Sequence, residues 1–371
     1  MYIILIGRTA LQTFIERRQA VALAGACFRR PIRILVPVAL SLALISVLTA
    51  TNGFKYASVL ASDLNNQAAQ PPAVWENALE YFNSLLSLLY QPYANRDTRA
   101  VNFIPLGRIA WFVDVAFQQV FVVVVFAFVL PFTIFKYKVI GFASMIVLSA
   151  WIGRWSWYTV TGLVLAEFAV VYRSMMPDKS STAMAKRGQR RVSLTPPKFN
   201  TFQSAMTKIV PLAMIFIGVL FKYVWAAAAP QYQNKELLAH ANVNTGMLST
   251  NFDPVERAYP RYDDWFLCTG LLLLIELSDN AQNVLSSGLF VYLGRLGFSI
   301  ALISGTVMIS LGGLLHNHLV NTLHVTNPSL ILWVEFLAMV PCCLLCADTW
   351  SRLVDDAGLK LSHWFFHFVR N

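Results

Sequence analysis

The sequence predicts an all-α protein, a polytopic membrane helix bundle with about eight spans plus a partial N-terminal one. Three observations predict this fold class. The 371-residue chain is 57% hydrophobic with a mean hydropathy of +0.55, and only 13% of its residues are charged, whereas a soluble globular domain carries about 25% charged residues. The apolar residues form long runs, and Lys and Arg collect in the segments between those runs.

Eight apolar runs are predicted to be spans, because a helix needs about 20 apolar residues to cross a bilayer. In chain order these runs are 32–50, 109–131, 139–153, 155–172, 209–227, 265–278, 296–315 and 328–347. The runs 139–153 and 265–278 are short enough for a buried or re-entrant helix to compete with a full span. The opening MYIILI is too short for a span or a signal peptide, so we interpret it as the end of a partial span.

Basic residues orient the predicted bundle, because cytosolic loops of membrane proteins are enriched in Lys and Arg. Residues 173–198 carry seven basic residues against one acid, and residues 8–33 carry six against one. We therefore predict a single membrane domain over residues 1–371 with a cytosolic C-terminal tail. Its predicted loops are a cytosolic basic loop at 173–200 and extracytosolic loops at 51–108 and 228–264.

Within the first extracytosolic loop, WENALEYFNSLLSLLY has the apolar spacing of an interfacial amphipathic helix. The net charge of +10 lies mostly in the flanks of the runs, which favours attraction to anionic lipid headgroups. The lipid bilayer is thus a predicted partner and nucleic acid is not, because no aromatic-rich soluble module accompanies the basic residues. The CCLLC stretch is interpreted as small residues that pack helices closely, and no metal site is predicted.

Motifs of soluble enzymes, such as a glycine-rich phosphate loop, HExxH or GxSxG, are missing from the sequence. Asp114 and Gln118 lie four residues apart, on one helix face of a predicted span. An ionisable residue at membrane depth is by default a functional candidate, with a structural role as an equal alternative. Asp114 and Gln118 are therefore our first two catalytic candidates.

His316 and His318 are the other catalytic candidates, because histidine is the most frequent general base. They follow the seventh predicted span in what we expect to be an extracytosolic polar loop, and no nearby carboxylate completes a metal-ligand set. An ordinary loop position is the competing interpretation, so we expect Asp114 to matter more than either histidine.

Four stretches of the chain resemble the fungal branch of the acyltransferase 3 family. They are IGRTALQTFIERRQAVALAGACFRRPIRILVPV, RWSWYTVTGLVLAEF, VYLGRLGFSIALISG and ADTWSRLVDDAGLKLSHWF, in the family's order and spacing. The resemblance implies a multi-pass O-acyltransferase of the endoplasmic reticulum or plasma membrane that binds no cofactor. It would move an acyl group from acyl-CoA, as co-substrate, to a hydroxyl of a small molecule such as a fungal secondary metabolite.

Arg154 and Arg295, at predicted span ends, are the candidates for binding acyl-CoA. The competing interpretation is that arginines and glutamates at span ends, including Glu167, Glu276 and Glu335, are snorkelling anchors.

The chain departs from the family pattern at several points. In the family, a span that carries the catalytic histidine precedes the residues resembling IGRTAL, and that region is absent here. Ser304 and Ala301 stand where the family often has His and Tyr. We therefore expect little or no acyltransferase turnover, and a catalytically inactive or truncated family member with a structural or accessory role is the alternative. A transporter is disfavoured, because no repeated broken helices occur in matching halves.

Overall fold

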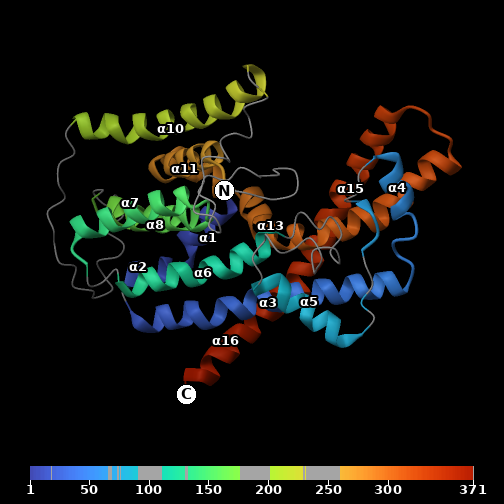
Figure 1. Ribbon diagram of the computed structural model, residues 1–371, viewed down its shortest axis with the longest axis horizontal. Helices are drawn as coiled ribbons and strands as arrows, with labels where there is room; N and C mark the ends of the chain where they lie inside the picture. Colours follow the sequence, from blue (N-terminus) through green and yellow to red (C-terminus); the bar gives the residue numbers. More distant parts are fainter. Residues whose placement is uncertain are drawn as a thin grey trace. The chain divides into compact units, whose positions relative to one another are not determined.

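The computed structural model describes residues 1–17, 19–65, 69–72, 75, 77–90, 111–129, 133–175, 201–228, 230 and 260–370. Throughout these ranges the regular structure is helical, as predicted (Figure 1). The chain divides into two compact units. Unit 1 comprises Met1–Leu23 and Val122–Leu285, and unit 2 comprises Ala24–Phe121 and Ser286–Asn371.

Unit 1 is built from short and medium helices. Its elements are α1 (Tyr2–Ala10), α2 (Gln12–Arg17), α7 (Phe135–Trp151), α8 (Ser156–Met175), α10 (Thr201–Ala228), α11 (Tyr262–Leu277) and α12 (Asp279–Leu285). In Figure 1, α10 runs alongside α11, and α1 packs on α8. Of the opening MYIILI, Tyr2–Ile6 begin α1, in which Ile3, Ile4 and Ile6 are buried.

Glycine sets how closely the helices of unit 1 approach one another. A Cβ atom on Gly7 would collide with the backbone of Thr159, and a Cβ atom on Gly162 would collide with the carbonyl of Ile4. Gly218 of α10 and Gly270 of α11 pack on backbone atoms of the opposite helix in the same way. Such small residues let membrane helices gain van der Waals contact along their backbones.

The turn from α7 to α8 ends the first helix with a left-handed glycine. Gly153 has φ 72°, its N–H bonds the carbonyl of Ala150 at 3.0 Å, and the N–H of Arg154 bonds the carbonyl of Ser149 at 3.0 Å. This pair of bonds is the Schellman motif, which satisfies carbonyls that the helix end leaves unpaired.

Unit 2 contains the long helices of the protein. Its elements are α3 (Ala20–Ala50), α4 (Ala57–Asp63), α5 (Ala78–Tyr90), α6 (Trp111–Val129), α13 (Gly288–Val307), α14 (Gly313–Asn317), α15 (Pro328–Trp350), α16 (Asp356–Arg370) and three π-helical turns, η9 (Met308–Gly312), η10 (His318–Thr322) and η11 (Ser351–Asp355). The π-helical turns join their neighbours into two continuous helices, Gly288–Thr322 and Pro328–Arg370. Helices α3 and α6 run across the boundary between the two units.

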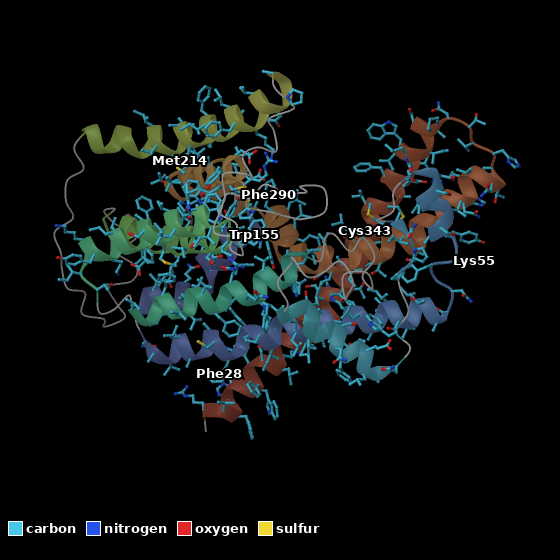
Figure 2. All side chains as sticks on the ribbon, in the orientation of Figure 1. Phe28, Lys55, Trp155, Met214, Phe290 and Cys343 are labelled. Carbon is cyan, nitrogen blue, oxygen red and sulfur yellow. The ribbon has the colours of Figure 1, made fainter. Side chains whose placement is uncertain are left out.

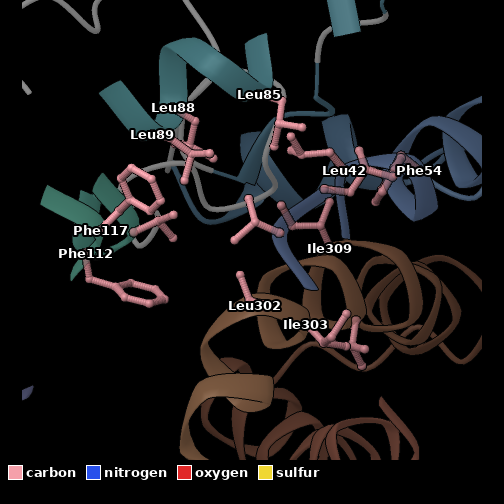
Figure 3. Packing of buried hydrophobic residues seen from close by; sticks show 14 of the residues in the cluster. Leu42, Phe54, Leu85, Leu88, Leu89, Phe112, Phe117, Leu302, Ile303 and Ile309 are labelled. Carbon is pink, nitrogen blue, oxygen red and sulfur yellow. The ribbon is translucent and has the colours of Figure 1, made fainter. Parts of the chain in front are cut away.

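A hydrophobic cluster holds unit 2 together (Figure 3). It joins side chains of α3, α5, α6, α13 and η9, among them Leu42, Leu88, Phe117, Leu302 and Ile309. The cysteines Cys342, Cys343 and Cys346 of α15 pack against this cluster as free thiols. Figure 2 shows Cys343 in this part of α15.

Each of the eight predicted spans coincides with a described helix. Three of the described helices are long and apolar enough to cross a membrane, namely Ala20–Ala50, Gly288–Thr322 and Pro328–Arg370. These helices indicate a membrane protein, and the count of eight spans stays a prediction. The helices 20–50 and 328–370 are longer than the predicted apolar runs 32–50 and 328–347. The additional residues, 20–31 and 348–370, are more polar and continue the same helices.

The predicted amphipathic segment forms α5, whose Leu85, Leu88 and Leu89 are buried while Leu79 and Phe82 are exposed. The predicted loop 51–108 contains α4 and α5, and its residues 91–108 lie outside the described residues. The predicted loops 173–200 and 228–264 fall largely on residues 176–200 and 231–259, which also lie outside the described residues. Their sidedness, and the single domain over residues 1–371, stay predictions.

Candidate functional site

The candidate site of unit 2 is centred on His316 in α14. The helix that carries it is interrupted by η9 before α14 and by η10 directly after it. A π-helical turn inserts an extra residue into the helical register, and such turns are frequent at functional sites. His316 is 5% exposed and thus lies inside the unit.

Two carboxylates hold the His316 ring, one at each nitrogen. Nδ1 lies 2.6 Å from Oε1 of Glu335 in α15, and Nε2 lies 3.1 Å from Oδ2 of Asp63 at the end of α4. The three residues come from three helices, and Asp63 is 253 positions away from His316 in the chain. The result is a carboxylate–imidazole–carboxylate triad.

Local backbone features position the members of the triad. Asn327 caps α15, where its side chain accepts the N–H of Ser329 at 3.0 Å, and this cap fixes the start of the helix that carries Glu335. A Cβ atom on Gly313 would lie 3.4 Å from the backbone of Tyr56. This is an ordinary van der Waals distance, so α14 is in contact with the start of α4, the helix that ends at Asp63.

The triad suits proton transfer. An imidazole donates an N–H from one nitrogen and accepts a proton at the other, which are the two contacts that a proton-transfer group needs. The Glu335 side chain is 19% exposed and the Asp63 side chain is 43% exposed. Asp63 is thus the more exposed of the two carboxylates.

The triad is arranged for a proton rather than a metal ion. The carboxylates bracket opposite nitrogens of the ring instead of converging on one point, and no group of three His, Cys, Asp or Glu side chains suited to a metal occurs in the described part of the chain.

The expectation that His316 lies in a polar loop without a nearby carboxylate is wrong. The helix continues past residue 315 to Thr322 through the π-helical turns, so His316 lies inside a packed helix. The carboxylates arrive by tertiary packing and not by proximity in the chain. His318, two residues on, is exposed and takes no part in the triad.

The other two catalytic candidates lie in α6. Gln118 donates from Nε2 to the carbonyl of Leu89 at 3.3 Å, which ties α6 to the end of α5. This contact gives Gln118 a structural role. The backbone of Asp114 belongs to α6, and its side chain lies outside the described residues.

The two arginine candidates lie in different surroundings. Arg154 is exposed in the turn between α7 and α8. Arg295 of α13 forms an exposed ion pair with Asp356 at 3.0 Å. One helical turn further, the buried Ser299 hydroxyl donates to Oδ2 of Asp355 at 2.6 Å, a contact that joins two of the stretches quoted for the family resemblance.

The glutamates expected as snorkelling anchors are all paired. Glu335 belongs to the triad, Glu276 of α11 pairs with Arg8, and Glu167 of α8 lies 3.7 Å from Nζ of Lys138. The sequence predicts that each of these glutamates has a partner, because a carboxylate within an apolar run needs one. It does not predict which residue that partner is.

An apolar cavity of about 700 Å³ lies between α3, the Gly288–Thr322 helix and α15. Its walls include Leu48, Tyr56, Leu314 and Trp350, and Nε1 of Trp350 is buried with no hydrogen-bond acceptor among the described residues. The triad does not line the cavity, although Leu314 precedes His316 by two residues on the same helix.

Comparison with models of protein families, with curated proteins and with solved structures finds no match to this chain.

Proposed function

We propose that the chain is a membrane-bound acyltransferase that moves an acyl group from acyl-CoA to a hydroxyl of a small molecule, with His316 as its general base. The observation that carries the proposal is the buried His316 ring held between Glu335 and Asp63. The resemblance of four stretches to the acyltransferase 3 family supports the class of reaction. The three long apolar helices support a membrane setting.

The proposed reaction needs one base that takes a proton and returns it. The acceptor hydroxyl displaces the exposed Asp63 carboxylate from Nε2, and Nε2 takes the hydroxyl proton while Glu335 holds Nδ1. The hydroxyl oxygen attacks the thioester carbonyl carbon, and collapse of the tetrahedral intermediate breaks the carbon–sulfur bond. The leaving thiolate takes the proton from the imidazolium, which yields the ester and free CoA. Such a base contributes about 10²–10⁴-fold in rate.

The apolar cavity of unit 2 supports the proposal as a place for the acyl chain. Its volume of about 700 Å³ lies within the range of small-molecule pockets. The unpartnered Nε1–H of Trp350 offers a donor for a carbonyl oxygen of a bound ligand.

The expectation of little or no turnover rested on two reasons, the missing counterpart of the family's histidine-bearing span and the lack of a histidine within a predicted span. His316 lies in a helix long enough to cross a membrane, which bears on the second reason alone, and the expectation stays a prediction. The inactive, structural or accessory member is the alternative against which the proposal is tested.

The test uses the purified full chain in detergent, where both ends of the helices are accessible. Acetyl-CoA or palmitoyl-CoA is mixed with a panel of hydroxylated small molecules, thiol release is followed, and the ester is identified by mass spectrometry. We expect thiol release that depends on the acceptor. Glu335→Gln should slow this release, by less than the factor of about 10²–10⁴ that a general base contributes. Asp348→Asn is the matched control, because Asp348 lies on the same helix and pairs with Arg352. Absence of thiol release, or an equal loss in the control, would contradict the proposal.

A further inference from the structure

A cluster of arginine and histidine side chains lies where α16 packs on the N-terminal half of α3, within unit 2. A Cβ atom on Gly358 would lie 3.7 Å from side-chain atoms of Pro37 and Val36, an ordinary van der Waals distance, so the two helices are in direct contact there. Ser362, one turn further along α16, is fully buried. Figure 2 labels Phe28 in the part of α3 next to α16, and Lys55 beyond the opposite end of α3.

The packing of the two helices brings an arginine of α3 against a histidine of α16. Nη1 of Arg29 lies 3.4 Å from Nδ1 of His363, and the Arg29 guanidinium lies over the Phe366 ring at 5.5 Å. Arg33 and His367 also lie within electrostatic range of His363. We name Arg29, Arg33, His363 and His367 the basic cluster.

No described carboxylate forms an ion pair with a member of the basic cluster. The side-chain partners of Arg29 are the Gly25 carbonyl at 3.0 Å, His363 and the Phe366 ring. Asp355 lies within electrostatic range of Arg33 and offsets part of its charge. Arg29 and Arg33 lie one turn apart on α3, where like charges repel one another, and a bound anion relieves that repulsion.

The surroundings of the basic cluster fit an anion at a membrane surface. Leu361, Trp364 and Phe368 on α16 are exposed, which gives this helix the apolar face of an interfacial helix beside a basic one. Both chain segments that supply the cluster belong to the flanks predicted to be cytosolic. An arginine guanidinium offers parallel N–H donors that match the oxygens of a phosphate, and an imidazole N–H adds a further donor.

We propose that the basic cluster is a binding site for a phosphate-bearing ligand. The phosphate comes either from the headgroup of an anionic lipid in the adjacent leaflet or from a soluble compound such as CoA. The site stands independently of the proposed acyl transfer, because it is carried by the charges of α3 and α16 and not by the triad.

The experiment titrates the purified full chain in detergent with dihexanoyl phosphatidic acid, dihexanoyl phosphatidylcholine and CoA, each followed by calorimetry. The variants are Arg29→Gln, Arg33→Gln and His363→Gln. Arg352→Gln is the matched control, because it removes an exposed guanidinium of the same helix region that Asp348 already neutralises at 2.8 Å. The melting temperature of each variant shows that it is folded.

We expect phosphatidic acid, CoA or both to bind, and each arginine variant to bind about fivefold more weakly. Binding of phosphatidic acid alone supports the lipid source, binding of CoA alone supports the soluble source, and mutual competition supports one site for both. The proposal is overturned if phosphatidic acid binds no better than phosphatidylcholine and CoA does not bind. It is also overturned if Arg352→Gln weakens binding as much as Arg29→Gln.

Discussion

The two units of the protein use their charged side chains in different ways. In unit 1, Glu276 pairs with Arg8 and Glu167 pairs with Lys138, and these side chains are at most 17% exposed. In unit 2, the buried His316 contacts two carboxylates, one at each ring nitrogen. The one-to-one pairs of unit 2, such as Arg295 with Asp356, are exposed. The difference therefore concerns the charged groups inside each unit, which are ion pairs in unit 1 and a histidine between two carboxylates in unit 2.

The packing of the two units differs in the same sense. Glycines of unit 1 bring backbones into direct contact, which leaves one arrangement of α1 on α8. The helices of unit 2 are interrupted by π-helical turns, and its apolar cavity of about 700 Å³ is larger than the apolar cavity of about 450 Å³ between α7, α8, α10 and α11 of unit 1. We therefore expect the closely packed helices of unit 1 to tolerate substitution less well than the helices of unit 2.

The largest effect on stability is expected from Glu276→Gln in unit 1. The Arg8 and Glu276 side chains are only 17% and 9% exposed, and removing one partner of a buried pair costs about 3–5 kcal/mol. The control is Asp356→Asn in unit 2, which breaks the exposed pair with Arg295 and should cost about 0–1 kcal/mol. Equilibrium unfolding in mixed detergent measures both, and equal losses would break the comparison.

Gly162→Ala should have the next largest effect. Its new Cβ atom would meet backbone atoms of Ile4 and Arg8, which cannot move aside without separating α1 from α8. We expect a loss of about 1–3 kcal/mol from overpacking. Gly141→Ala in α7 is the control, because its Cβ atom has nothing within 4 Å, and it should gain up to about 1 kcal/mol from helix propensity. If both variants behave alike, glycine does not set the packing of unit 1.

For Tyr81 in unit 2 we expect a smaller effect on stability, and one that depends on pH. Its hydroxyl donates to the Ala39 carbonyl at 2.6 Å, and burial raises the pKa of Tyr81 above its usual value. The unfolded chain therefore ionises first, so the stabilisation is complete below about pH 10 and is lost as the pH rises through the folded-state pKa. Tyr81→Phe should lose about 1 kcal/mol near pH 7, and the difference from wild type should shrink above about pH 10.

Melting temperatures between about pH 8 and pH 11 measure the Tyr81 effect. A difference between Tyr81→Phe and wild type that stays constant or grows with pH would contradict the assigned role of burial.

The helices were predictable from the sequence, and the triad was not. Apolar runs report on local periodicity, so each of them coincides with a described helix, including the opening segment that forms α1. His316 was judged by its neighbours in the chain, which hold no carboxylate, while its partners lie 19 and 253 positions away. The π-helical turns that extend the helix past residue 315 leave no pattern in hydropathy.

The basic cluster shows the same limit. In the sequence, Arg29 and Arg33 indicated only which side of the membrane their segment faces. Their proximity to His363 depends on how α16 packs on α3 near Gly358. Sequence patterns locate charges along the chain, and tertiary packing decides which charges meet.

The central claim, that His316 is the base of unit 2, is tested most directly by comparing His316→Gln with His318→Gln in acyl-CoA turnover. The two histidines lie two positions apart on one helix, and only His316 contacts the carboxylates. The account predicts that His316→Gln lowers turnover about 10²–10⁴-fold while His318→Gln leaves it near the wild-type value at equal expression and melting temperature. Turnover of His316→Gln within about threefold of wild type, a small fraction of what a general base contributes, would contradict the claim.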